Sequence, residues 1–376
     1  PKLGNIAVNT DADVTIGNGD VNGSADIDLR NIFFNGQNFN NILANVTKDG
    51  KQVSGKVSVD DTDLALQADG NATINGKASV IDATVQIGRF SPSRFTAAKA
   101  LASRSFSGNI AVHVNGLDPN TATGSVALSD FSIHSQGRNP LHIGNIHLAA
   151  EAGEARTVTL HSDFIDGTVT GTFDISRLPQ TMTAIAAHAV PALMPGYDKA
   201  YSTAGQILDF DITINDDNTL PEYFNLPVRL LTDIRITGAV DGNTETASVN
   251  VDIPYLQQGT NKLIRGTYLQ ARLDGINRTS MLDLGTILPG KNNTDVDVGL
   301  SAFGNGDKLR ANVNWDLNRP KKYTGDVAME MSASKGNDNS RSFGLHILPS
   351  KFHVADAVWH IGDGNVSFDN GRLSVE

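Results

Sequence analysis

Histidines are the side chains of this sequence with the widest chemical range, because imidazole binds transition metals and exchanges protons near neutral pH. His134, His142 and His147 lie close together, and His161 follows them. No His-Glu-x-x-His motif is present, and no histidine spacing matches a zinc-binding helix. On regular strands His142 and His147 would point to opposite faces. We therefore expect solvated strand histidines. A Ser-His-Asp site on a β scaffold is the alternative, although no Gly-x-Ser-x-Gly nucleophile motif occurs.

Three pairs of carboxylates are spaced two residues apart, which would place both members of a pair on one face of a strand. A glycosidase or a calcium site could use such pairs. Each pair alternates with apolar residues, so a solvated outer face explains it without any site, and this is the interpretation that we favour. The pairs are Asp11 with Asp13, Asp209 with Asp211, and Asp295 with Asp297. We predict no catalytic residues, no cofactor and no metal site, and hence a protein that is not an enzyme.

Charge and composition exclude several classes of protein. The 376 residues carry a net charge of -11, whereas nucleic-acid binding needs clustered Lys and Arg. There is no cysteine, so disulfides, thiolate catalysis and Cys-zinc sites are excluded. No apolar run of about 18 residues is present to span a bilayer, and no signal peptide is recognisable. Both ends interrupt the strand pattern, so we expect a piece of a longer protein.

Most of the chain reads as strands with one apolar and one polar face. Leu309, Val313 and Trp315, for example, alternate with Arg310 and Asn314. Asn-Gly, Asp-Gly and Gly-Asn-Gly-Asp pairs recur between such segments and suit tight hairpin turns. The prediction is an all-β chain of about 25 strands, mostly antiparallel, at the usual spacing of neighbouring strands. The turns are expected at Gly17–Asp20, 22–23, 35–36, 49–50, 75–76, 274–275, 304–307 and 370–371.

Two hairpins share one plan. In the first, strands around Val57 and Leu66 flank a turn at Asp60-Asp61-Thr62; in the second, strands around Val158 and Val169 flank a turn at Ile165-Asp166-Gly167. Gly70 and Gly171 hold matching places and suggest a bulge or a bend. This similarity predicts quasi-repeat units at about residues 1–104 and 105–200, followed by 201–376, within one continuous segment.

Two apolar, alanine-rich stretches break the strand pattern. They span residues 93–103 and 181–193, are bordered by prolines, and read as one or two short helices. Each follows one of the two hairpins. Such helices could close the ends of an apolar trough or cap an exposed sheet edge.

The apolar strand faces must be covered by a second sheet, a closed barrel or an apolar ligand. An ordinary β-sandwich core is the simplest solution. The alternative is an elongated sheet curled into an open apolar trough, and this is the fold that we predict. The residues on the apolar side of their strands that should line it are Val57, Leu66, Val158, Val169, Phe173, Leu309, Val313, Trp315, Phe352, Val354 and Phe368.

The C-terminal part carries a resemblance to a known family. It reads Pro349-Ser350-Lys351-Phe352, then Trp359-His360-Ile361, then two short strands around Asn370-Gly371. This resembles the TamB-like branch of the AsmA-like superfamily in its Bacteroidetes form. The resemblance implies an inner-membrane-anchored periplasmic protein with an apolar β-groove, linked to phospholipid movement and to outer-membrane β-barrel assembly. The membrane anchor and the end that meets a barrel partner would lie outside this segment.

The resulting functional hypothesis is a non-enzymatic lipid conduit in the periplasm, whose partners are phospholipids or other acyl lipids. A first alternative is an assembly factor that offers sheet edges to nascent β-barrel strands by strand addition. A second alternative is a surface carbohydrate-binding protein, which would need aromatic platforms. Six Tyr and two Trp supply few of these.

Overall fold

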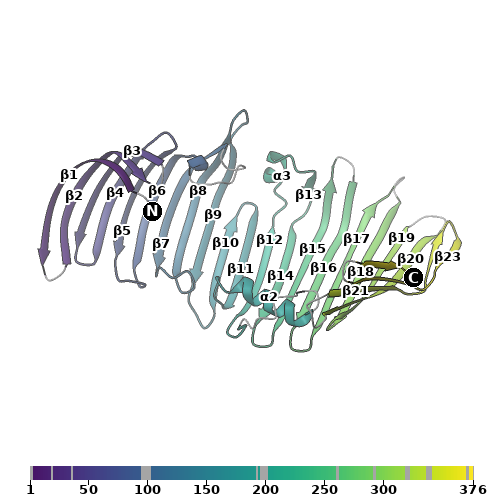
Figure 1. The fold of residues 1–376 in the computed structure, drawn as a ribbon. Coiled ribbons are helices and arrows are strands. Elements are labelled where there is room, and N and C mark those ends of the chain that lie inside the picture. Colours follow the sequence, from purple (N-terminus) through teal and green to yellow (C-terminus); the bar gives the residue numbers. More distant parts are fainter. Residues whose placement is uncertain are drawn as a thin grey trace. The chain divides into compact units, whose positions relative to one another are not determined.

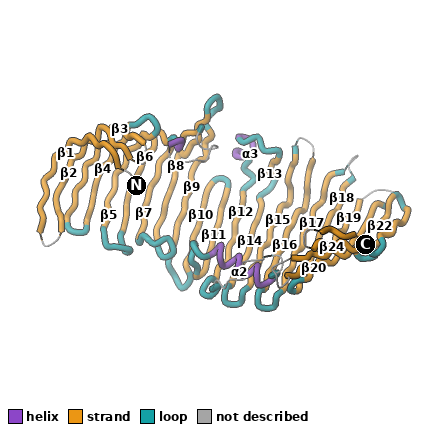
Figure 2. Tube along the Cα trace, in the orientation of Figure 1, coloured by secondary structure: helices purple, strands orange, loops and turns teal. Residues whose placement is uncertain are grey.

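The protein is an all-β molecule in which strands account for 71% of the residues that the structure describes (Figures 1 and 2). The computed structural model describes residues 3–17, 20–34, 37–94, 103–191, 194, 202–259, 262–290, 294–317, 322–335, 341–369 and 372–375. These residues form 25 strands, two α-helices and one 3-10 helix. The predictions of a strand-dominated, antiparallel and open sheet with few short helices are confirmed.

The contacts between residues divide the chain into two units, Pro1–Asp163 and Phe164–Glu376. Unit 1 is a ten-stranded meander, in which each strand pairs antiparallel with the next one along the chain. Its strands are β1 (Leu3–Gly17), β2 (Asp20–Phe34), β3 (Gln37–Asp49), β4 (Gln52–Asp60), β5 (Leu64–Thr73), β6 (Val80–Phe90), β7 (Arg104–Asn115), β8 (Thr123–Ser135), β9 (Leu141–Glu151) and β10 (Arg156–Ser162), with the 3-10 helix η1 (Pro92–Arg94) after β6.

Unit 2 contains the remaining strands and both α-helices. Its elements are β11 (Ile165–Thr172), α2 (Leu178–Ala189), β12 (Ile207–Ile214), α3 (Thr219–Tyr223), β13 (Val228–Leu230), β14 (Ile234–Asp241), β15 (Thr246–Gln258), β16 (Lys262–Asp274), β17 (Thr279–Pro289), β18 (Asp295–Asn305), β19 (Lys308–Leu317), β20 (Tyr323–Lys335), β21 (Arg341–Ile347), β22 (Ser350–Val354), β23 (Ala357–Ile361), β24 (Gly364–Asp369) and β25 (Arg372–Val375). From β11 to β20 the strands again follow one another antiparallel, except that the short β13 lies beside β15.

The last strands of unit 2 continue the same meander in broken pieces. β21 and β22 both pair with β20, one beyond the other. β24 pairs with β21, and β23 pairs with β22, in a single register. Pro349 has no amide hydrogen, so it interrupts the ladder between β21 and β22. The four short strands are therefore two long strands, each broken once, and β25 lies beside β24.

Among the predicted turns that the structure describes, most lie between strands, as expected from their sequences. The predicted turns at 35–36 and 370–371, and the middle of the one at Gly17–Asp20, lie outside the described residues. The turn at Asp60-Asp61-Thr62 joins β4 to β5, and Asp49-Gly50 lies where β3 ends. Two predicted turns are wrong. Asn22-Gly23 lies inside β2, and Ile165-Asp166-Gly167 begins β11. At Gly23 a side chain would collide with the backbone of β1, so glycine is needed there for close strand approach and not for a turn.

Gly171 likewise serves close packing. The register of β11 with β12 runs through it without a shift, so the predicted bulge or bend is absent. Its φ of 155° leaves no room for a Cβ, which would lie 2.7 Å from the Cα of Leu208. Gly70 also sits in an unshifted register, opposite Gly55.

One of the two predicted helices is present and fully described. α2 begins at Leu178, a few residues before the predicted start, and ends at Ala189. The other prediction, residues 93–103, falls mostly outside the described residues, apart from η1. The five-residue α3 was not predicted. The carboxylate of Asp217 accepts a hydrogen bond from the Thr219 amide at its start (2.6 Å), as an N-terminal cap does.

The hydrophobic core of unit 2 lies beneath α2. Ile185 of the helix is completely buried against Leu208, Val240 and Ala247, which come from β12, β14 and β15. Figure 1 shows the helix running along the lower end of these strands. His188 near the helix C-terminus is 2.8 Å from a carboxylate oxygen of Glu245 in the β14–β15 turn, which ties the helix to that end of the sheet.

Candidate functional site

Unit 1 has one face that is apolar across all its strands, because the cross-strand register aligns apolar positions. One row runs from Ile27 of β2 through β3 to β9 without interruption. Its members in order are Ile27, Ala44, Val57, Ala68, Val85, Ile110, Leu128 and Ile146. Parallel rows pass through Val59 and Leu66 and through Val126, Leu148 and Leu160. We call this surface the apolar face of unit 1.

The apolar face of unit 1 is poorly covered. Among the described apolar side chains on the strands of this unit, only Val59, Ile133 and Leu141 are buried. Most of the others are half-buried, and Ile16 and Val8 are 76% and 53% exposed. Within the described part of unit 1, η1 is the only helical element, and it touches β7. A well-packed second layer would instead leave a core of fully buried side chains.

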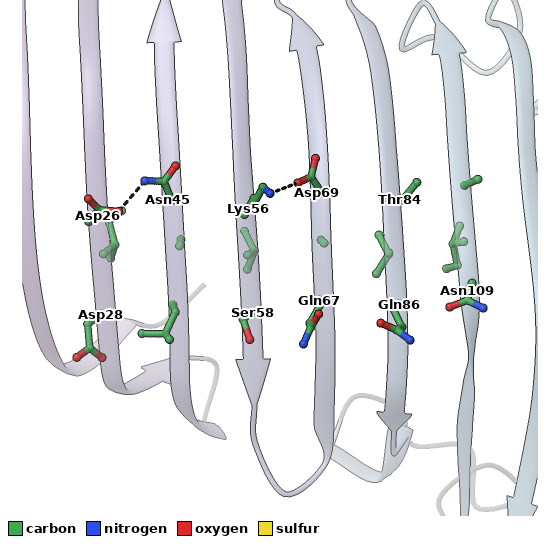
Figure 3. A pocket seen from close by; sticks show the side chains of 18 of the residues that line it. Asp26, Asp28, Asn45, Lys56, Ser58, Gln67, Asp69, Thr84, Gln86 and Asn109 are labelled. Atoms are coloured by element: carbon green, nitrogen blue, oxygen red, sulfur yellow. Dashed lines mark hydrogen bonds and ion pairs between the residues drawn. The ribbon is translucent and has the colours of Figure 1, made fainter.

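The opposite face of unit 1 is polar and hollowed. A hollow of about 1020 Å³ extends over β1 to β8. Figure 3 shows two rows of polar side chains along it, on either side of a row of apolar positions. On β1 and β8 only residues of the polar face border the hollow, which places it on that face: Asn9, Asp11, Ala127 and Ser129. A twisted sheet is saddle-shaped, so either face can be concave along one diagonal.

Hydrogen bonds within the polar rows connect neighbouring strands. The side-chain amide of Asn45 donates a hydrogen bond to a carboxylate oxygen of Asp26 (2.6 Å). Lys56 Nζ lies 3.1 Å from a carboxylate oxygen of Asp69. The Lys56 and Asp69 side chains are 79% and 54% exposed, so water and salt screen the pair. These contacts order the sheet surface and do not form an acid–base pair isolated from solvent.

The charged groups with displaced pKa values also stay in their ordinary ionised forms. In unit 2 the Arg235 guanidinium donates hydrogen bonds to both carboxylate oxygens of Asp211, and this lowers the pKa of that carboxyl. A hydrogen bond from the side chain of Asn277 lowers the pKa of Asp274 in the same way. A general acid at neutral pH needs a raised carboxyl pKa, and these two shifts run the other way.

The apolar face of unit 2 continues the alternation but is partly covered by α2. Val169, Phe173, Phe210 and Leu273 pack against the core beneath the helix. Farther along the sheet, Leu309, Met331, Leu345 and Val366 stand opposite one another on β19, β20, β21 and β24. With Val190, Phe343 and Phe368 they line an apolar pocket of about 260 Å³.

Three aromatic rings form a row on the same face near the C-terminal end. The ring centroids of Trp315 and Phe352 are 6.1 Å apart, and those of Phe352 and Trp359 are also 6.1 Å apart. Gly325 of β20 stands between Trp315 and Phe352 in the register, and any side chain there would collide with the Trp315 ring. Trp359 is 55% exposed, so the row presents an aromatic surface to solvent.

The eleven predicted lining residues fall into two groups, and all but Phe173, which follows β11, lie on the apolar side of a strand. Val57, Leu66 and Val158 belong to unit 1. In unit 2, Val169 and Phe173 lie beneath α2, and Leu309 and Phe368 line the pocket. Val313 stands between Leu300 and Val327. Trp315 and Phe352 belong to the aromatic row, and Val354 is 39% exposed beside it. That all eleven line one shared interior stays a prediction.

Sequence reasoning missed several residues of these surfaces. Leu345 and Trp359 have the same parity as their predicted neighbours, and the alternation alone could have found them. Val190 falls within the predicted helix, but no sequence signal indicates that it borders a pocket with strands more than a hundred residues later.

The prediction that His142 and His147 face opposite sides is wrong. The register of β8 with β9 shifts near Gly144, whose φ is 73°. A β-bulge of this kind reverses the parity of the following residues. His142 therefore stands opposite Ser132 and His147 opposite Ala127, both on the polar face. Among the described residues no group of three or more His, Cys, Asp or Glu side chains is arranged to hold a metal ion.

Comparison with known proteins adds no identification: no protein-family model, curated protein or solved structure matches the chain.

In the part of the chain that the structure describes, no helix has both the length and the apolar character needed to cross a membrane.

Proposed function

We propose that this protein is a passive carrier of acyl lipids, which lie along the apolar faces of its sheets. The observation that supports this most directly is the apolar face of unit 1. It crosses ten strands, aligns apolar side chains in continuous rows, and has little cover among the described residues. Monomeric soluble proteins rarely leave so large an apolar surface exposed unless something binds it.

The free energy of burying an acyl chain favours its movement along the apolar face over binding at one fixed position. Each buried methylene contributes roughly 0.8 kcal/mol, whichever apolar row it contacts. The rows are composed of similar Ala, Val, Ile and Leu side chains. Neighbouring positions therefore hold an acyl chain about equally well, and the chain can pass from one to the next. Polar head groups stay in water, and no chemical step is required.

The polar hollow on the opposite face suits a different role. Its side chains include Asp11, Asp26, Asp28 and Asp69 against the single cation Lys56. An anionic head group would be repelled there. In this proposal the polar face keeps the sheet hydrated and directs acyl chains to the apolar face.

The resemblance of Pro349–Val375 to the TamB-like proteins leads to the same proposal and adds a setting. In that setting the chain is part of an inner-membrane-anchored, envelope-spanning periplasmic protein that supports outer-membrane biogenesis. Its lipids are phospholipids, and an outer-membrane β-barrel protein is the partner of another part of the protein.

Native mass spectrometry of the purified chain tests the proposal. We expect phospholipid-sized adducts that detergent washing removes slowly. Val85→Asp places a carboxylate in the central apolar row, and Thr84→Asp places the same group one residue away on the polar face. The first variant should lose most of the adduct and the second should keep it, while circular dichroism shows both to be folded. A parent chain free of lipid, or equal lipid in both variants, would contradict the proposal.

A second candidate function rests on the aromatic row. Stacked, exposed rings such as Phe352 and Trp359 also suit the apolar faces of sugar rings, so surface carbohydrate binding is the alternative. Trp359→Ala should then abolish retention on a glycan array. Under the lipid proposal the array stays blank, and Trp359→Ala weakens only lipid adducts.

A further inference from the structure

The bulge at Gly144 gathers histidines on the polar face of β8, β9 and β10. His134, His142, His147 and His161 all lie there, on three neighbouring strands. Two of them are engaged with serines. The Ser107 hydroxyl is 2.8 Å from Nε2 of His134, and the Ser132 hydroxyl is 2.9 Å from Nδ1 of His142.

The other two histidines face each other directly. His147 of β9 and His161 of β10 are cross-strand partners, and the pairs on either side of them keep the same register. Residues directly opposite on antiparallel strands have Cβ atoms about 4.5–5.5 Å apart. Both side chains are exposed. The next strand carries only Ala127 opposite His147, and Ala149 is the next residue of β9 on the same face, so small neighbours leave space around the imidazole of His147.

Two imidazoles at this separation can coordinate one ion. Imidazole nitrogen is a preferred ligand of Zn²⁺, Cu²⁺ and Ni²⁺. Each ring can keep a hydrogen bond at one nitrogen and bind the metal through the other, as metal-bound histidines commonly do. The chain contains no cysteine, so no thiolate competes for such an ion.

We propose that His147 and His161 chelate one divalent transition-metal ion of the Cu²⁺, Ni²⁺ and Zn²⁺ class, with water completing the coordination. The site joins β10, the last strand of unit 1, to β9. Metal binding should affect only the pairing of β9 with β10. β10 is seven residues long, and its described pairing with β9 comprises six residue pairs. An ion that binds only the paired strands stabilises that pairing by mass action. This inference is independent of lipid binding.

Isothermal titration of the whole chain with NiCl₂ at pH 7.5 tests the site. We expect one Ni²⁺ per chain at the tightest site, and weaker binding at lower pH because metal ligands must be deprotonated. His147→Ala and His161→Ala should each lower the affinity at least about tenfold, since even residues behind the ligands have effects of that size. The matched control His134→Ala/His142→Ala removes two histidines of the same face and should leave the tight site intact.

Hydrogen exchange provides the second measurement, and it needs no variant. Ni²⁺ should slow amide exchange in β10 and in its partner residues on β9, while exchange in β4 and β5 stays unchanged. The proposal is overturned if no Ni²⁺ binds with a Kd below about a millimolar, if either single variant binds as the parent does, or if the control double variant loses the site. Protection that spreads evenly over unit 1 would also contradict it.

Discussion

The apolar faces of the two units have the same strand pattern but different surroundings. In unit 1 the described face has three buried apolar side chains, and the rest are half-buried or exposed. In unit 2 the helix α2 covers part of the face and creates a core in which Ile185 is fully buried. The comparison teaches that alternation makes an apolar face, whereas a covering element decides whether that face becomes a buried core or stays exposed.

The two units can be followed separately in solution. Both tryptophans of the chain, Trp315 and Trp359, belong to unit 2. Tryptophan fluorescence therefore reports on unit 2, while the circular dichroism of strands reports on both units. The predictions below use this difference.

The largest effect is expected where the face has become core. Ile185→Ala removes a completely buried side chain and leaves a cavity between α2 and the sheet. We expect unit 2 to lose about 2–5 kcal/mol of unfolding free energy, measured by urea titration of tryptophan fluorescence. Val85→Ala, in a half-buried position of unit 1, should cost clearly less when followed by circular dichroism. Equal costs would mean that the two faces are covered to the same degree.

A charge introduced into an uncovered part of the apolar face should have a smaller effect. Val313 is half-buried between Leu300 and Val327, and it does not belong to the core beneath α2. Val313→Asp should cost about 1–3 kcal/mol, because the carboxylate can still reach water. Asn314→Asp, its exposed neighbour on the polar face, should be nearly neutral. If Val313→Asp prevents folding, this part of the sheet is closed like a sandwich.

An ion pair on the polar face of unit 2 should give a pH-dependent effect. Arg235 lowers the pKa of the Asp211 carboxyl, chiefly by hydrogen bonding to it. A lowered folded-state pKa stabilises the protein above the unfolded value of about 3.9, and this is lost as pH falls through the folded value. Asp211→Asn should thus destabilise unit 2 at pH 7 and make little difference near pH 2. A difference that is independent of pH would contradict the pairing.

The smallest effect is expected at the exposed pair of unit 1. Lys56→Ala removes the contact with Asp69 in the polar hollow. Exposed pairs contribute about 0–1 kcal/mol, so the change should be slight and should shrink further as salt is added. The same variant should leave lipid adducts unchanged, because Lys56 lies on the polar face. Loss of lipid adducts in this variant would indicate that lipid binds in the polar hollow and not on the apolar face.

Local patterns predicted much of the fold. Alternation placed ten of the eleven predicted lining residues on the apolar side of a strand, and most of the Asx-Gly pairs in the described residues lie at hairpin turns. The failures have local causes that a single sequence does not display. Asn22-Gly23 has a turn composition but continues β2, because glycine is needed where β1 approaches closely. The face of His147 was predicted wrongly because of the bulge near Gly144, since one extra residue turns every later side chain to the other face.

The sequence by itself determined which side chains share a face, because side-chain direction on a strand depends on the parity of nearby residues. Only the tertiary structure decided what lies over each face. Ile185 reaches Leu208, Val240 and Ala247 on three different strands, and Val190 borders a pocket with Leu309 and Phe368. Such contacts depend on the twist of the sheet and on how segments far apart in the sequence are brought together. The polar hollow of unit 1 has the same origin, since curvature is a property of many strands together.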